Sequence, residues 1–139
     1  MVARLLAFSI NAKAGLAFTK GLSSVEEPDI WIRSLDEQTS LWIDVGEPSP
    51  DRIKKASRQS REVKVYSFNS KSDVWWEQGR SKFAMLKVSI FRFDSQSVKA
   101  FTALVERTMD VSITITGDSA FIAADSGECE VAWEPLQVV

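Results

Sequence analysis

The sequence predicts an α/β (α+β) domain built on a mixed sheet with flanking helices. Residues 41–68 read as strand, helix and strand, an order that favours a parallel crossover. Apolar and polar residues alternate after residue 110, which predicts antiparallel strands at the C-terminal end. A chain of 139 residues suits a single domain, which we expect to span residues 1–139.

The N-terminal part begins with a predicted helix over residues 2–14, because its apolar side chains recur at close to helical spacing. Residues 16–27 are expected to form a connection. Residues 28–33 form a short predicted strand, and residues 41–45 form a second strand that pairs with it as a hairpin.

The next helix has a clear start signal. Ser49 is a good N-cap, Pro50 fits the first helical position, and Asp51 suits the positive end of the helix dipole. The inward face is expected to consist of Ile53, Ala56, Ser57 and Ser60. The strand that completes the crossover is expected at residues 63–68.

The remaining chain alternates between helices and strands. A helix is predicted over residues 72–81, a strand over residues 83–93, and then a helix capped by Asp94 or Ser95. The inward face of this last helix is expected to comprise Val98, Phe101, Leu104, Val105 and Thr108. Gly117 and Asp118 form a two-residue turn between strands, and the final strand directs one set of side chains to one side: Cys129, Val131 and Trp133.

The composition excludes several classes of function. The net charge of −2 gives no global basic field, so nucleic-acid binding would need a local patch. Histidine is absent, which excludes Ser-His-Asp and Cys-His catalysis and His-ligated zinc. We therefore expect no zinc, and nothing in the sequence indicates an organic cofactor. A metal would be held by oxygen, which points to Mg²⁺, Mn²⁺ or Ca²⁺.

The single cysteine and the N-terminal residues bear on location. Cys129 has no partner for an internal disulfide, which fits a reducing compartment, and we expect it to be a buried strand residue. The N-terminal apolar run is too short to span a bilayer and is unlike a signal peptide. The expected location is cytoplasmic, without membrane association.

Two aspartates on the predicted hairpin form the best candidate site. Asp29 opens the first strand, and Asp44 lies near the end of the second. Two carboxylates on paired strands can share one Mg²⁺ or Mn²⁺, with the carbonyl of Val45 as a further ligand. A nearby lysine would orient the attacking water, and a helix N-terminus favours anions. These parts would serve metal-dependent phosphodiester hydrolysis.

The sequence around Asp29 and Asp44 matches the PD-(D/E)xK nuclease pattern in part. Pro28 and Asp29 precede the second acid by about fifteen residues. The pattern places lysine two residues after that acid, where this chain has Gly46. The following helix supplies a replacement, and on a helical wheel Lys54 lies beside the inward face while Lys55 points nearly opposite it. We therefore assign Lys54 the catalytic role beside Asp29 and Asp44.

The same helix carries a run of basic residues that could track a phosphate backbone. The predicted nucleic-acid contacts are Arg52, Lys55, Arg58 and Arg61. The alternative is a solvated helix face without a ligand. Trp75 and Trp76 could stack on bases, but core packing is the simpler interpretation because adjacent helical residues point in different directions.

Several runs resemble the YaeQ family, in order and along essentially the whole chain. They are Arg4-Leu5-Leu6-Ala7-Phe8, Phe18-Thr19-Lys20-Gly21-Leu22, Glu27-Pro28-Asp29, Leu41-Trp42-Ile43-Asp44-Val45-Gly46, Arg52-Ile53-Lys54-Lys55-Ala56, Val63-Lys64-Val65-Tyr66, Trp75-Trp76 and Arg107-Thr108-Met109.

The resemblance implies a small bacterial protein with a variant of the PD-(D/E)xK nuclease-like, or restriction endonuclease-like, fold and no established activity. It places Asp29 at the first acidic position and Asp44 at the second, where relatives usually carry Glu. It also implies that relatives begin further upstream, so that this chain lacks the family's usual N-terminal segment.

Three functional hypotheses remain open from the sequence, and whether the chain is an enzyme is not decided. The first is a Mg²⁺-dependent nuclease or phosphodiesterase that uses Asp29, Asp44 and Lys54. The second is a non-catalytic interaction module that binds nucleic acid or transcription machinery through the basic helix. The third is a structural relic without a ligand.

Overall fold

A computed structural model gives the fold and describes residues 2–13, 15–18, 28–33, 38–69, 71–104, 111–124 and 127–138. The elements, in chain order, are α1 (Val2–Ile10), β1 (Leu16–Phe18), β2 (Ile30–Arg33), β3 (Thr39–Val45), α2 (Pro50–Gln59), β4 (Ser60–Ser67), α3 (Ser72–Phe83), β5 (Val88–Phe93), α4 (Ser95–Leu104), β6 (Val111–Thr116), β7 (Ser119–Ala124) and β8 (Gly127–Gln137).

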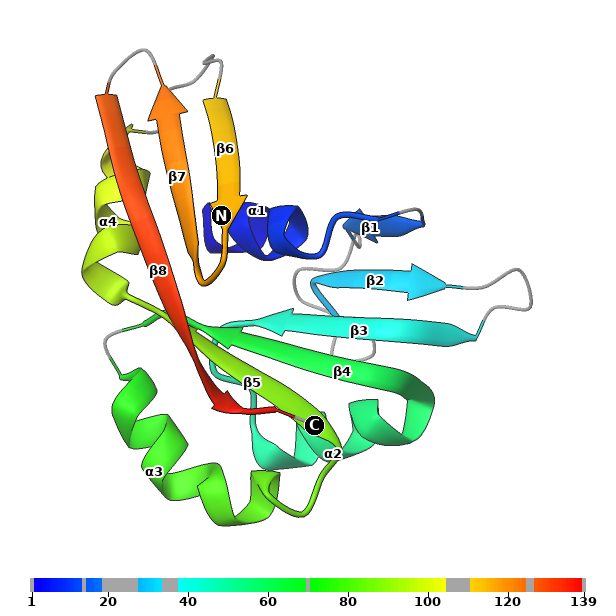
Figure 1. Ribbon diagram of the computed structural model, residues 1–139. Coiled ribbons are helices and arrows are strands. Elements are labelled where there is room, and N and C mark those ends of the chain that lie inside the picture. The colour runs from blue at the N-terminus through cyan, green and yellow to red at the C-terminus, as the bar shows by residue number, and fades with distance from the viewer. Residues whose placement is uncertain are drawn as a thin grey trace.

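The strands form one curled mixed sheet in the order β1-β2-β3-β4-β5-β8-β7-β6 (Figure 1). β3, β4 and β5 run parallel to one another, and the other neighbouring strands are antiparallel. The predicted parallel crossover through α2, the hairpin of β2 with β3 and the antiparallel C-terminal strands are therefore confirmed. A helical connection is what two parallel neighbours require, because a tight turn cannot join them.

The helices cover the sheet on both faces. α1 and α4 pack on one face through residues such as Leu6 and Phe101, against Ile43 and Tyr66. α2 and α3 pack on the other face through Ile53 and Phe83, among a second set of apolar side chains: Trp42, Ala56, Val63, Val65, Val88 and Ile90. Side chains of successive strand residues point to opposite faces, so the apolar runs of β3 and β4 supply both cores.

The start of α2 forms as its sequence predicts. The Ser49 hydroxyl accepts a hydrogen bond from the Arg52 amide at 3.2 Å, and Pro50 occupies the first helical position. Ile53 and Ala56 are buried, as expected for the inward face. Ser60 is wrong as a member of that face, because the helix ends at Gln59 and Ser60 is the first residue of β4.

Other boundaries differ from the predicted ones. α1 ends at Ile10, and β1 lies within a segment that was expected to be a connection. α3 continues to Phe83, so β5 begins only at Val88. The Phe83 ring contacts Trp75 and Trp76 of its own helix, and this packing holds the last turn of α3 in helical conformation. The segment 83–93, predicted as one strand, therefore begins with the last residue of α3 and becomes a strand only at Val88.

The C-terminal elements follow the predicted pattern. The Asp94 carboxylate accepts a hydrogen bond from the Ser97 amide at 3.1 Å and so caps α4. Gly117 turns the chain between β6 and β7 with a φ of 56°, which glycine adopts readily. In β8, Val131 and Trp133 are buried and their neighbours exposed. Val105 and Thr108, predicted on the inward face of α4, lie outside the described residues.

Within the described ranges, none of the helices is long and apolar enough to cross a membrane.

The close approach of Gly79 to Phe83 yields a prediction about stability. Alanine normally stabilises a helix by about 1 kcal/mol relative to glycine. At position 79, however, a Cβ atom would lie 2.6 Å from two ring carbons of Phe83, which is fully buried. We expect Gly79→Ala to lower the free energy of unfolding, measured by urea denaturation, because the buried ring must shift. Ser81→Ala, at an exposed position of α3, is the control, and equal stabilisation by both variants would contradict the predicted clash.

Candidate functional site

The two predicted aspartates lie side by side at the open end of the β2–β3 hairpin, where β2 begins and β3 ends. The Asp29 amide donates a hydrogen bond to the Ile43 carbonyl at 3.1 Å, which extends the β2–β3 ladder by one residue. The Asp29 carboxylate accepts a hydrogen bond from the Val45 amide at 2.8 Å. Antiparallel pairing therefore places Asp29 against the end of β3, where Asp44 resides.

Asp44 is buried and forms a bidentate ion pair with Arg52. Arg52 Nε lies 3.0 Å from Asp44 Oδ2, and Arg52 Nη2 lies 3.1 Å from Oδ1. The Asp44 side chain is 4% exposed and that of Arg52 is 25% exposed. The Ser49 cap fixes the first turn of α2, and this turn carries Arg52 toward the end of β3. Two parallel N–H···O bonds of this kind give both strength and a defined orientation.

Asp29 is held by a second arginine, from α1. Arg4 Nη2 donates a hydrogen bond to the Asp29 carbonyl at 3.1 Å, and Arg4 Nε lies 3.5 Å from Asp29 Oδ1. The Arg4 guanidinium also lies over the Phe18 ring, 5.2 Å from its centroid. Each of the two aspartates is thus charge-paired with an arginine from a different helix.

Burial raises the pKa of Asp44 above its ordinary value of 3.8. The hydrogen bonds and the charge of Arg52 oppose this shift but do not reverse it, and the nearby charge of Asp29 adds to it. The two carboxylates are therefore close enough to influence each other. The dominant effect is the loss of water around Asp44.

The backbone explains why lysine does not follow the second acid. Gly46 has a φ of 127°, a conformation that residues with a Cβ atom rarely adopt. Its amide donates to the Tyr66 carbonyl at 2.8 Å, which ties this turn to β4. The next residue, Glu47, accepts a hydrogen bond from the Phe68 amide at 3.1 Å. The loop after β3 is thus shaped by backbone contacts that disfavour lysine at position 46.

Lys54, the predicted replacement, is exposed on α2. It follows Arg52 by two residues and so points roughly 200° away around the helix. Since Arg52 is the residue directed at Asp44, Lys54 is turned away from the aspartate pair. Lys55, Arg58 and Arg61 are exposed as well. The structure thus brings Asp29, Asp44, Val45 and Arg52 together and leaves the other predicted residues on the outer surface of α2 and the start of β4.

The two predicted carboxylate ligands and the Val45 carbonyl are present, and no further acidic side chain of the described residues joins them. Across the described parts of the chain, no cluster of three or more Asp, Glu, His or Cys side chains could hold a metal ion. The oxygens of Asp44 already bind Arg52, so a cation would have to displace that guanidinium. The Mg²⁺ or Mn²⁺ site at Asp29, Asp44 and the Val45 carbonyl stays a prediction.

Most of the other candidate residues have packing roles. Trp75 is half-buried and its indole nitrogen donates to the Pro48 carbonyl at 2.7 Å, while Trp76 stacks on Phe83. Tyr66 is buried, and its hydroxyl accepts a hydrogen bond from Asn11 Nδ2 at 2.9 Å. Cys129 is half-buried on β8, less enclosed than expected, and burial raises the pKa of its thiol.

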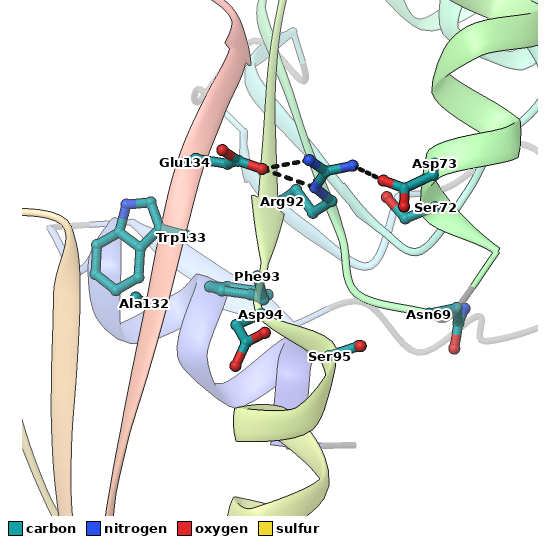
Figure 2. A pocket seen from close by; sticks show the side chains of 10 residues that line it. All are labelled: Asn69, Ser72, Asp73, Arg92, Phe93, Asp94, Ser95, Ala132, Trp133 and Glu134. Carbon is teal, nitrogen blue, oxygen red and sulfur yellow. Dashed lines mark hydrogen bonds and ion pairs between the residues drawn. The ribbon is translucent and has the colours of Figure 1, made fainter.

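A pocket of about 410 Å³ lies at the carboxyl ends of β4 and β5, where α3 and α4 begin. Ligands often bind at such positions in α/β sheets. Arg92 lines this pocket between Asp73 of α3 and Glu134 of β8 and forms ion pairs with both (Figure 2). Asp94 caps α4, and the Ser72 hydroxyl bonds to that of Ser67 at 2.6 Å. The charged groups of the pocket thus hold its walls together.

Two residues near the aspartate pair were not indicated by the nuclease pattern. Arg4 contacts Asp29, and Glu47 holds the loop after β3. The sequence could have pointed to Arg4, because it is the one charged residue in the mostly apolar helix Val2–Ile10. Glu47 had no such signal, because its partners Phe68 and Asn69 follow the next strand. Arg52 was predicted to contact nucleic acid, but in the structure it contacts Asp44.

A family model described as "YaeQ protein" matches residues 1–133. The protein named "Uncharacterized protein YaeQ" from Escherichia coli (strain K12) is 34% identical, over 96% of this chain and 77% of its own. The Salmonella typhi protein of that name is 33% identical with the same coverage.

Two crystal structures are similar over 98% of this chain. The YaeQ protein from Xanthomonas axonopodis pv. citri has a TM-score of 0.92 and 32% identity, with 78% of its chain covered. The YaeQ protein from Pseudomonas syringae has a TM-score of 0.89 and 30% identity, with 76% covered.

The raised pKa of Asp44 predicts a specific pH dependence of stability. A carboxyl whose pKa is higher in the folded than in the unfolded state binds protons more readily when folded, so its contribution to stability falls as pH rises. We expect the stability of the wild type relative to Asp44→Asn to decrease above pH 3.8 until the raised folded pKa is passed. Urea denaturation of both proteins between pH 4 and pH 7 measures this difference.

Comparing the two proteins removes the titration of all other carboxyl groups, which they share. A stability difference that grows in favour of the wild type as pH rises would show that Arg52, rather than burial, dominates the pKa of Asp44.

Proposed function

We propose that this chain, which belongs to the YaeQ family, binds nucleic acid through the outer surface of α2 without cleaving it. The observation that carries the proposal is the division of charge on this helix. Arg52 points inward and is used by Asp44, while Lys54, Lys55, Arg58 and the following Arg61 are exposed. The inward arginine serves the fold, and the outward cations remain available to a ligand.

The four outward cations form a local basic patch on a chain whose net charge is −2. In the described part of the molecule, none of them lies within ion-pair distance of a carboxylate. The buried residues of α2 are Ile53 and Ala56, and Lys54, Lys55 and Arg58 lie on its exposed side. Exposed cations of this kind bind the phosphates of nucleic acids, and the affinity of such binding falls steeply as the salt concentration rises.

The same geometry argues against hydrolysis as the primary activity. Catalysis by two carboxylates and a metal needs open coordination positions. Arg52 bonds to both oxygens of Asp44, the Val45 amide bonds to one oxygen of Asp29, Arg4 Nε lies 3.5 Å from the other, and Lys54 faces away. Two arginines and two aspartates form a charge-balanced group, which supports a structural role.

Binding is tested by fluorescence anisotropy with labelled DNA and RNA oligonucleotides at several salt concentrations. We expect Lys55→Ala/Arg58→Ala to weaken binding roughly tenfold to a hundredfold at 0.1 M salt and to reduce the salt slope by about two, since each lost phosphate contact removes about one counterion.

Lys13→Ala/Lys99→Ala is the matched control. Both lysines are exposed and lie outside α2, and Lys99 is on α4, on the opposite face of the sheet. Equal losses in the two double variants would show only a general charge effect, and no salt-dependent binding by the wild type would overturn the proposed function.

A second candidate, a Mg²⁺- or Mn²⁺-dependent phosphodiesterase, is supported by the adjacency of Asp29 and Asp44. If it is correct, cleavage of single- or double-stranded DNA or RNA appears on titration with millimolar Mg²⁺ or Mn²⁺ and disappears in Asp44→Asn. Activity retained in Asp44→Asn would assign the cleavage to a contaminant or another site. The absence of metal binding at millimolar concentration, measured by calorimetry, would exclude this candidate.

A further inference from the structure

The basic surface of α2 continues across the amino ends of the parallel strands. α2 leads into the start of β4, and α3 leads through a short turn into the start of β5 (Figure 1). β4 and β5 are parallel neighbours with Val63 beside Val88, so Arg61 and Lys87 both lie at the amino ends of these strands. α2 and α3 pack against each other on one face. The fold therefore gathers cations from two helices and two strand starts.

We call this surface the basic rim and define it by seven of the chain's 17 lysines and arginines: Lys54, Lys55, Arg58, Arg61, Arg80, Lys82 and Lys87. All seven side chains belong to exposed residues. Two of the acids nearby are already paired, Glu77 with Arg80 at 3.6 Å and Glu62 with Lys64 at 3.8 Å. Glu77 offsets the charge of Arg80, and the other six cations keep the rim positive in a protein of slightly negative net charge.

Helix ends explain only part of this arrangement. Cations in the last turn of a helix interact favourably with its dipole, which accounts for Arg58, Arg80 and Lys82. Lys54, in the middle of α2, and Lys87, in the turn before β5, gain nothing from it. Their placement at exposed positions beside the other cations suits a ligand that extends beyond a single helix.

We propose that the basic rim binds the phosphate backbone of a nucleic-acid duplex, with Lys82 and Lys87 extending the contact made by α2. This proposal rests on the proposed function and adds the class of ligand. Duplex DNA carries one negative charge per roughly 1.7 Å of helix axis. Cations presented on several packed elements can contact such a rod at more than one phosphate.

The aromatic residues favour a duplex over a single strand. Proteins that bind single strands stack bases on exposed aromatic rings. Near the rim, Trp75 is bonded to Pro48 and Trp76 is stacked on Phe83. Among the described residues, the exposed aromatic rings are Phe18 and Phe121, and these lie on β1 and β7, away from β4 and β5 in the sheet. The rim offers charge without stacking platforms.

The test compares Lys82→Ala/Lys87→Ala with the Lys13→Ala/Lys99→Ala control in anisotropy titrations from 0.05 to about 0.3 M salt. The probes are duplex DNA, duplex RNA and single strands of the same length, each in two unrelated sequences. We expect the duplex salt slope of Lys82→Ala/Lys87→Ala to be about two lower in magnitude, with the control unchanged. We also expect the wild type to bind duplexes more tightly than single strands, with equal affinity for both sequences.

The outcomes separate this inference from the function on which it rests. If the wild type binds none of the probes, the proposed function itself fails. If it binds and Lys55→Ala/Arg58→Ala weakens the complex while Lys82→Ala/Lys87→Ala does not change the slope, the rim ends at α2 and the extension is wrong. Tighter binding of single strands would overturn the duplex assignment. Circular dichroism of each variant checks that the fold is retained, which we expect because all substituted side chains are exposed.

Discussion

A buried carboxylate must have a partner, and Asp44 finds one in Arg52. An ionised group without water is costly to leave unpaired. The bidentate pair fixes the first turn of α2 against the end of β3. Because α2 is the crossover between β3 and β4, its placement determines how the parallel part of the sheet is covered. The ion pair thus links the chemistry of the candidate site to the architecture around it.

The second pair, between Arg4 and Asp29, repeats this arrangement from the other helical layer. α1 is thereby tied to the start of β2, beside the end of β3 where α2 is tied. A position that the sequence pattern associates with metal binding is occupied by two arginine–aspartate contacts. The opposite charges of the two arginines offset the cost of burying the two acids.

Charge is distributed unevenly between the two ends of the parallel strands. Acidic residues surround Arg92 at the carboxyl ends, where they fasten α3 and β8 to β5. Cations dominate at the amino ends, where α2 and α3 finish. The slightly negative net charge therefore does not reveal that positive and negative side chains are gathered at opposite ends of the parallel strands. The interaction surface of the protein must be sought from the arrangement of charges rather than from their sum.

The sequence by itself determined the local elements. The Ser49–Pro50 start of α2, the crossover from β3 to β4 and the alternation in β8 depend on capping and periodicity, which act over a few residues. It also placed Asp29 and Asp44 on paired strands. The tertiary structure decided what these acids contact and that Lys54 points outward. Sequence spacing could not supply that information, because Arg4, Asp29, Asp44 and Arg52 come from α1, the residue before β2, β3 and α2, and the relative positions of these segments depend on sheet order and on which helix face is buried.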